Sequence, residues 1–354
     1  MKEKNINILK RSFLVAIAVA ISIQVCNFFN LSHFYAGIGA LNVSDLNDSK
    51  TRKQAYDRVI TTIFGGTIAC IICMLGFQEN LIMYVLGLCI VCCFNEVVVR
   101  VPSAVGCIAF TYIMLNVDPD KTPINYLLER VIGTFAGVAA ISLVITLYNY
   151  FFNKEEMKKK APPTPKGDLK KLFLKGLEPG LAVILGLFLV KFINHFFDPA
   201  YITNYTLYYC ALAIVVPFRL EWSELLLRTK ERFLSTVFGG IVAFILYFSG
   251  FQGTFWCSVG IILVIIITEI FVKVPASLGG IVFMFIMVNM KRPGLTPMIY
   301  YTNRVYGTAM GIITIIIFSF LFNKVVEKYK LKGVKLKKPN LNNLSRRKKW
   351  FLIL

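Results

Sequence analysis

Long apolar stretches without a single charged residue dominate this chain. Residues 13–29, 59–77 and 131–148 each lack Asp, Glu, Lys and Arg. About 20 helical residues cross a hydrocarbon core of about 30 Å, so runs near this length predict membrane-spanning helices. Hydrophobic residues make up 56% of the sequence and charged residues only 16%. This composition excludes a soluble globular protein and a disordered chain.

The sequence also contains two copies of one membrane unit. Residues 58–78 align with 232–252 at an offset of 174, and residues 96–116 align with 269–289 at an offset of 173. Each alignment has 10 identities in 21 positions. Self-similarity at a fixed offset indicates a duplicated structural unit. Four further residues recur in the same order: Thr122, Pro123, Tyr126 and Arg130 as Thr296, Pro297, Tyr300 and Arg304.

Each copy contains six predicted spans, of which the second and fifth are too short for a full crossing. Such segments are expected to be tilted, broken or shielded by their neighbours. We predict an all-α polytopic membrane protein of about 12 transmembrane helices, in two parallel six-helix repeats related by a pseudo-twofold axis along the membrane normal. The predicted spans are 12–30, 33–44, 59–77, 80–97, 102–117 and 128–152, then 175–196, 203–218, 233–250, 253–271, 275–290 and 302–322.

The predicted domain organisation follows from these spans. Residues 1–152 form the first repeat, 153–170 a basic cytoplasmic linker, 171–323 the second repeat and 324–354 a basic cytoplasmic tail. The first apolar segment follows a basic stretch, as in a secretory signal, but no cleavage site follows it, so we interpret it as a retained helix.

The distribution of positive charge sets the expected orientation. The net charge is +20, and 33 of the 39 Lys and Arg residues fall on one side of the predicted topology. This asymmetry indicates cytoplasmic termini and contact with anionic lipid headgroups rather than with nucleic acid. Abundant Ile, Lys, Phe and Asn suit an AT-rich bacterial genome, so the expected location is a bacterial plasma membrane.

One short motif, R-x-x-x-T-x-x-G, begins the third and sixth spans of both copies. Because these spans enter the membrane from opposite faces, the motif suggests inverted three-helix units. Its glycines are best explained by close helix packing. Its arginines either line a path for an anion or anchor helices at the headgroups. We favour anchoring for Arg58 and Arg232, at cytoplasmic helix starts, whereas Arg130 and Arg304 at the outer face are the stronger anion-binding candidates.

Two repeated carboxylates and two repeated amides complete the candidate site. Glu96 and Glu269 each precede a cation by four residues. That spacing favours a local ion pair on one helical face, and the alternative is a protonatable group that couples transport to a proton gradient. Asn116 and Asn289, near the outer face, are expected to cap helices or meet interfacial water, with pore lining as the second interpretation.

Enzymatic chemistry finds no support in the sequence. It has only two histidines, its cysteines lie in apolar segments, and it contains no nucleotide-binding loop of the G-x-x-x-x-G-K-[ST] type. We therefore expect no catalytic residues, no metal and no cofactor.

The two six-span units with their R-x-x-x-T-x-x-G helix starts resemble the fusaric acid resistance and aromatic acid exporter family. The resemblance implies export of aromatic carboxylates and related weak acids, driven by ion gradients. In the related plant aluminium-activated malate transporters, dimers of six-span units line an anion path with basic residues. The resemblance therefore implies one path on the pseudo-twofold axis. The short linker and tail depart from many members of the family.

Three functions remain open at this point. The first is a proton-coupled exporter of small organic anions that binds them with Arg130 and Arg304 and uses Glu96 and Glu269 for coupling. The second is a passive organic-anion channel of the same architecture. The third is a membrane scaffold or envelope assembly factor without a conducted substrate, which would use the basic residues 346–350 for lipid or partner contact.

Overall fold

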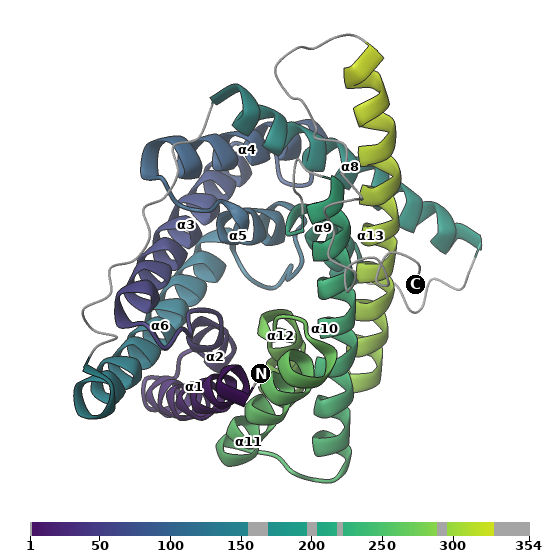
Figure 1. The fold of residues 1–354 in the computed structure, drawn as a ribbon. Coiled ribbons are helices and arrows are strands. Elements are labelled where there is room, and N and C mark those ends of the chain that lie inside the picture. Colours follow the sequence, from purple (N-terminus) through teal and green to yellow (C-terminus); the bar gives the residue numbers. More distant parts are fainter. Residues whose placement is uncertain (1, 155–168, 197–203, 218–221, 289–295, 329–354) are drawn as a thin grey trace.

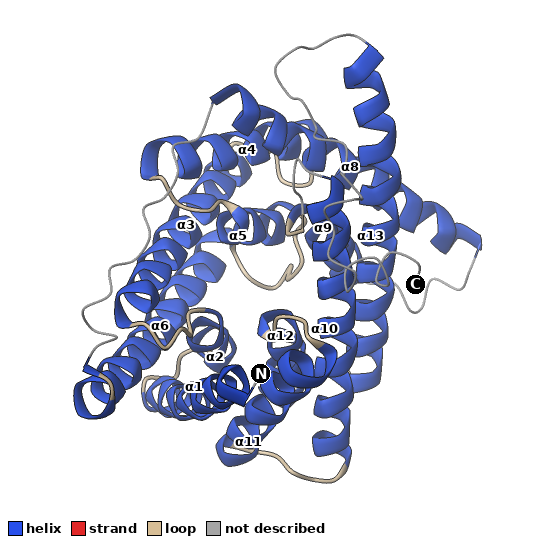
Figure 2. Ribbon diagram, in the orientation of Figure 1, coloured by secondary structure: helices blue, strands red, loops and turns tan. Residues whose placement is uncertain are grey.

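The computed structural model describes residues 2–154, 169–196, 204–217, 222–288 and 296–328. Within these ranges every regular element is helical and no strand occurs (Figure 2), which confirms the expected all-α fold. The elements are α1 (Lys2–Phe28), α2 (His33–Asn42), α3 (Asp48–Met74), α4 (Leu81–Cys93), η1 (Phe94–Val99), α5 (Ala104–Met114), α6 (Pro123–Phe152), α8 (Leu169–Phe196), α9 (Asn204–Val215), α10 (Trp222–Phe248), α11 (Thr254–Ile265), η3 (Ile266–Val272), α12 (Ser277–Val288) and α13 (Pro297–Lys328).

Most of the expected linker and tail lies outside the described residues. Residues 155–168 of the linker and 329–354 of the tail are not described. The flanking helices α6 and α13 extend as far as Phe152 and Lys328.

We call the helices before the linker, α1 to α6, the first set and those after it, α8 to α13, the second set. The repeated Thr-Pro pair begins the last helix of each set. The hydroxyl of Thr122 accepts a hydrogen bond from the backbone N–H of Asn125 at 3.3 Å, and that of Thr296 accepts one from Ile299 at 3.2 Å. The prolines occupy the first helical position, where a missing N–H costs nothing. The repetition of this pair therefore has a capping explanation.

Several helices extend beyond the spans predicted from hydropathy. α3 begins at Asp48 and α10 at Trp222, each about three turns before the apolar run that was assigned to the span. Polar residues with good helix propensity continue a helix outside the hydrocarbon, whereas hydropathy marks only its apolar part. Arg58 and Arg232 consequently lie well inside their helices, and their predicted placement at helix starts is wrong.

Eight of the described helices are long and apolar enough to cross a membrane. The second and fifth helices of each set, α2, α5, α9 and α12, contain only 10 to 12 residues. At 1.5 Å per residue this length is about half of the hydrocarbon thickness. The prediction that these segments are short is confirmed, while the predicted 12 crossings are not reproduced by helix length. The short helices lie in the interior, surrounded by the longer ones (Figure 1).

The helices before and after the linker pack in matching pairs. Within the first set α2 contacts α6 and α3 contacts α5, and in the second set α9 contacts α13 and α10 contacts α12. Between the sets, α1 packs against α11 and α8 against α4, while α2 meets α12 and α9 meets α5. Each set thus places its first two helices against the fourth and fifth helices of the other, and neither set is a separate globule.

Glycines allow the closest of these contacts. A Cβ atom on Gly65 would lie 2.1 Å from the carbonyl oxygen of Gly106, and one on Gly239 would lie 2.2 Å from that of Gly279. Gly137 and Gly311 would likewise meet carbonyl oxygens at 2.0 and 2.3 Å. Real side chains do not fit at these distances, so the packing interpretation of the motif glycines is confirmed.

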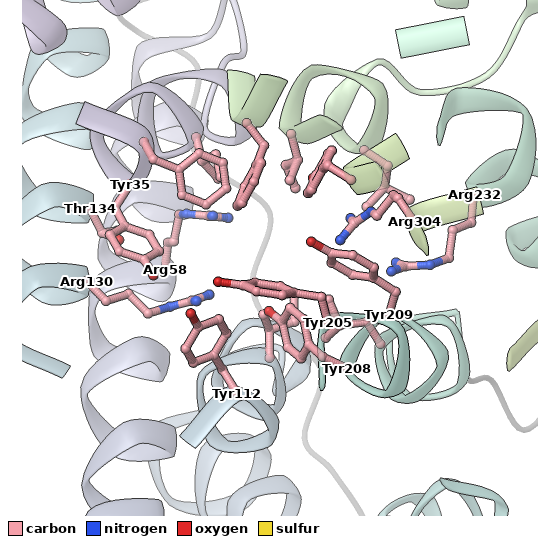
Figure 3. A pocket seen from close by; sticks show the side chains of 18 residues that line it. Tyr35, Arg58, Tyr112, Arg130, Thr134, Tyr205, Tyr208, Tyr209, Arg232 and Arg304 are labelled. Carbon is pink, nitrogen blue, oxygen red and sulfur yellow. The ribbon is translucent and has the colours of Figure 1, made fainter. Parts of the chain in front are cut away.

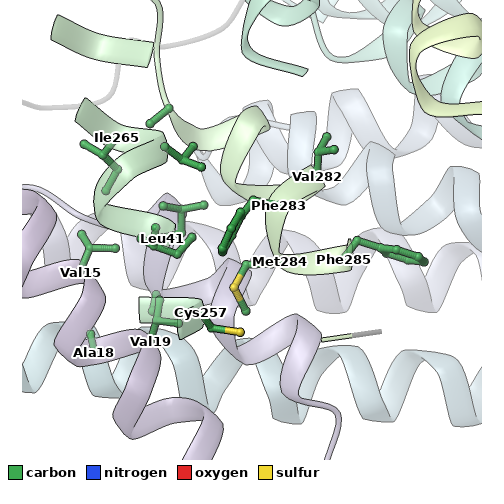
Figure 4. Close-up of a cluster of buried hydrophobic side chains, with 14 of the residues drawn as sticks. Val15, Ala18, Val19, Leu41, Cys257, Ile265, Val282, Phe283, Met284 and Phe285 are labelled. Atoms are coloured by element: carbon green, nitrogen blue, oxygen red, sulfur yellow. The ribbon is translucent and has the colours of Figure 1, made fainter. Parts of the chain in front are cut away.

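A core of apolar side chains fills the contact between the two sets. Val15 and Val19 of α1 pack with Leu41 of α2, and Phe283 and Met284 of α12 lie against them (Figure 4). All five are less than a tenth exposed. This contact holds the short helices α2 and α12 beside each other and so forms one wall of the interior.

Candidate functional site

The four motif arginines converge on one interior cavity. Arg58 of α3 and Arg130 of α6 reach it from one side, and Arg232 of α10 and Arg304 of α13 from the other (Figure 3). Arg130, Arg232 and Arg304 are 8%, 2% and 3% exposed. Groups that lie more than 70 residues apart in the sequence therefore share one site, and the headgroup-anchor interpretation of Arg58 and Arg232 does not hold.

The cavity is lined by aromatic, aliphatic and basic side chains, and no carboxylate lines it among the described residues. Its volume is about 70 Å³. A buried cavity of about 150 Å³ holds benzene. The cavity as it stands therefore has room for a carboxylate-sized anion or a few waters. A complete aromatic acid fits only after side chains move.

Most of the lining residues form pairs at the same sequence offsets as the repeated segments. Seven such pairs line the cavity, at offsets of 173 or 174. They are Phe34 and Tyr208, Tyr35 and Tyr209, Ile38 and Leu212, Arg58 and Arg232, Ile108 and Ile281, Tyr112 and Phe285, and Arg130 and Arg304.

On one side of the cavity, Arg130 is held by tyrosines. Its Nη1 donates a hydrogen bond of 2.5 Å to the hydroxyl of Tyr126, and its guanidinium carbon lies 5.4 Å from the centre of the Tyr35 ring. Tyr126 in turn stacks on Tyr112, with ring centres 4.1 Å apart. Attraction between the cation and the ring faces partly offsets the loss of water around the guanidinium.

On the other side, Arg304 lies 4.3 Å from the centre of the Tyr209 ring. Tyr300 stacks on Phe285 with ring centres 4.0 Å apart. Nε and Nη1 of Arg232 and Nε of Arg304 are buried and have no hydrogen-bond partner. A buried donor without an acceptor costs about 1–3 kcal/mol, and more when the group is charged. These nitrogens are therefore strong candidates to bind an anion.

Among the described residues, no acidic lining residue compensates the positive charge of the cavity. The positive charges of Arg304 and Arg232 repel each other, and so do those of Arg130 and Arg58. Isolated charges are very costly to bury and are usually paired. The arrangement is thus chemically suited to binding an anion.

The two repeated carboxylates lie elsewhere and do not form the predicted i, i+4 ion pairs. Glu96 accepts a hydrogen bond of 2.7 Å from the hydroxyl of Ser103, and Glu269 accepts one of 3.2 Å from the backbone N–H of Ala276. Both contacts lie at the N-terminal end of the short helix that follows, α5 or α12, where a negative charge is favourable.

The local backbone explains why the ion-pair prediction is wrong. Residues 94–99 and 266–272 form π-helical turns, and the residues that follow them, Arg100 and Lys273, have φ of 61° and 63°. A π-helical turn and a left-handed residue change the direction of side chains that an α-helix would align. Glu269 instead pairs with Arg11 of α1 at 2.5 Å.

Of the two predicted asparagines, Asn116 does not line the arginine cavity. Asn116 lies in the turn after α5 with φ of 46° and borders a separate, smaller pocket with Gln78 and Lys121. Asn289 lies outside the described residues. Thr134, by contrast, lines the arginine cavity.

Sequence reasoning missed the aromatic lining. Tyr35 and Tyr209, at an offset of 174, belong to the second helix of each set, where few identities support an alignment. Their signal was only that tyrosines recur at the repeat offset, as Tyr126 and Tyr300 do.

These features define a multi-pass helical membrane protein with a basic, aromatic interior cavity. Residues 15–145 match the family model described as fusaric acid resistance protein-like. The family resemblance stated from the sequence is confirmed over this segment, which runs from α1 to near the end of α6. Comparison with curated proteins found no match, and comparison with solved structures found none.

Proposed function

We propose that the protein carries small organic anions across the membrane, with aromatic carboxylates as the first candidates. The observation that carries the proposal is the convergence of four arginines, three of them buried, on a cavity without an acidic lining residue in the described chain. Guanidinium groups bind carboxylates through paired hydrogen bonds. Aromatic walls next to them suit a ligand with a flat apolar body.

The cavity is too small for an aromatic acid unless lining side chains move. Because the present volume suits a carboxylate rather than a ring, binding of an aromatic acid requires displacement of lining side chains. Tyr35 and Tyr112 line the cavity from the short helices α2 and α5. Rotation of such side chains would enlarge the site without breaking the glycine contacts between the helices.

The proposed architecture is a pair of parallel six-helix repeats, residues 1–152 and 171–323, around a pseudo-twofold axis through the cavity. The matching packing pairs and the seven lining pairs at the repeat offset support it. In this arrangement the short helices complete their crossings with the adjoining turns, where surrounding helices shield irregular backbone from lipid. The asymmetric distribution of Lys and Arg supports cytoplasmic termini, and the abundance of Ile, Lys, Phe and Asn supports a bacterial plasma membrane location.

We further propose that protonation of Glu96 and Glu269 couples transport to a proton gradient. Both carboxylates lie at the joint between a π-helical turn and a short helix that reaches the cavity. Protonation there would weaken the contact that holds the end of α5 or α12. A passive channel of the same architecture would need no such coupling, and a scaffold would need no cavity.

The test is flux of 4-hydroxybenzoate through the reconstituted full-length protein carrying R130Q together with R304Q. We expect flux to fall to the level of empty liposomes, because the double substitution removes one guanidinium from each side. The matched control is R228Q, which removes an arginine from α10 one turn from Arg232 that pairs with Glu231 outside the cavity. Flux unchanged in the double variant would remove these arginines from the site.

A further inference from the structure

The two sides of the cavity share a geometry but differ in chemistry. We define the Arg130 side as Arg58, Tyr112, Tyr126, Arg130 and Tyr208. The Arg304 side consists of their equivalents at the repeat offsets: Arg232, Phe285, Tyr300, Arg304 and Phe34.

The ring arrangement is nearly the same on both sides. Tyr112 stacks on Tyr126 at 4.1 Å and meets Tyr208 edge-on at 5.1 Å. Phe285 stacks on Tyr300 at 4.0 Å and meets Phe34 edge-on at 5.1 Å. The packing of these rings is therefore equivalent, but Tyr112 and Tyr208 carry hydroxyl groups where Phe285 and Phe34 have none. Tyr205, whose equivalent is Leu31, contributes a further tyrosine next to Phe285.

The hydrogen bonding of the arginines differs in the same direction. Arg130 donates to the hydroxyl of Tyr126, whereas the equivalent hydroxyl, that of Tyr300, is buried and has no hydrogen-bond partner. No nitrogen of Arg130 is left buried and unpartnered, whereas two of Arg232 and one of Arg304 are. Arg58 has one such nitrogen. The Arg304 side therefore has three buried arginine nitrogens without a partner, and the Arg130 side has one.

We infer that the anionic group of the ligand binds on the Arg304 side, between Arg232 and Arg304, and that the ligand enters this near-symmetric cavity in one orientation. Arg232 and Arg304 offer buried donors without acceptors, whereas the hydroxyl of Tyr126 accepts a hydrogen bond from Arg130. The ring faces of Phe34 and Phe285 receive the apolar part of the ligand next to its carboxylate. This inference rests on the proposed function, since it assigns the anion subsite within the same cavity.

The experiment is equilibrium binding of radiolabelled 4-hydroxybenzoate to the purified full-length protein in detergent, compared between variants at equivalent positions. We expect R304Q and R232Q each to weaken binding by about tenfold or more, and R130Q and R58Q each by less than about threefold. Each pair removes the same charge from equivalent helices, so a general effect of positive charge would act equally. Equal losses, or a larger loss for R130Q and R58Q, would overturn the inference.

A second pair of variants exchanges the hydroxyl groups without removing charge. F34Y together with F285Y gives the Arg304 side the acceptors of the Arg130 side, and we expect it to weaken binding at least threefold. Y112F together with Y208F removes the two hydroxyl groups from the Arg130 side, and we expect it to weaken binding less than F34Y with F285Y does. The opposite ranking would contradict the assigned subsite.

The outcomes separate this inference from the proposed function. If the wild-type protein does not bind the labelled acid, both are overturned. If it binds and the variants rank in the opposite order or equally, only the one-orientation assignment fails, because the cavity still binds an anion.

Discussion

Arg11 and Glu269 form an ion pair of 2.5 Å that joins the first helix of the chain to the π-helical segment η3 in its second half. The two side chains are only 25% and 18% exposed. The pair accompanies the packing of α1 against α11. A contact between residues this far apart in the sequence stabilises the assembled state and contributes nothing to either helix alone.

We expect R11Q to lower the midpoint of thermal unfolding in detergent, with a cost of about 1 kcal/mol for a partly exposed pair. E269Q should cost slightly more, because Glu269 also accepts a hydrogen bond from the N–H of Ala276. The double variant should be little worse than E269Q. Fully additive losses would show that the two residues do not act as a pair.

Substitution of Glu96 and Glu269 tests whether transport is coupled to protons. E96Q together with E269Q should abolish the response of transport to a pH gradient while leaving exchange between labelled and unlabelled anion measurable. Because E269Q also breaks the ion pair with Arg11, R11Q is the control and should retain the response. Transport that remains fully sensitive to the pH gradient in the double glutamine variant would exclude these residues as the coupling groups.

The motif glycines give a prediction about folding. A Cβ on Gly65 would overlap the carbonyl of Gly106, so G65A must separate α3 from α5. The expected cost is about 1–3 kcal/mol, with a corresponding fall in the melting temperature. The control is G180A, whose Cβ would meet a side-chain carbon of Val85 at 3.1 Å. A G65A variant as stable as G180A would contradict the close helix contact.

The sequence predicted the helical fold because hydropathy is a local signal. Thr122 and Thr296 mark helix starts, and Gly65 and Gly239 mark close contacts, by residue type alone. Hydropathy could not locate the start of α3, because its first turns are polar and still helical.

The cavity could be predicted only in part, since it depends on which helices meet. The R-x-x-x-T-x-x-G motif identified all four arginines, but linear position suggested that Arg58 and Arg232 anchor helices. Packing of α3 against α6 and of α10 against α13 brings them to Arg130 and Arg304, and the reciprocal packing of the two helix sets joins the two pairs in one cavity. The π-helical turn before Arg100 likewise lacks a sequence signature strong enough to rule out the expected pair with Glu96.

The basic tail separates a transporter from a scaffold. Removing residues 329–354 deletes the basic segment 346–350 and leaves α13 and the cavity residues in place. We expect the truncated protein to retain most of its flux in liposomes, with weaker association to anionic lipid. Complete loss of flux in a stably inserted truncation would favour the scaffold interpretation, in which the tail carries the function.

The most direct test of the account is uptake of radiolabelled 4-hydroxybenzoate into proteoliposomes, with and without an imposed pH gradient. We predict accumulation above equilibrium that requires the gradient, collapses with a protonophore and is absent in the R130Q and R304Q double variant. Equilibration without accumulation, accompanied by electrical current, would contradict coupled transport and place the protein among passive channels. No flux of the acid under either condition would contradict the central claim that the four-arginine cavity serves its passage.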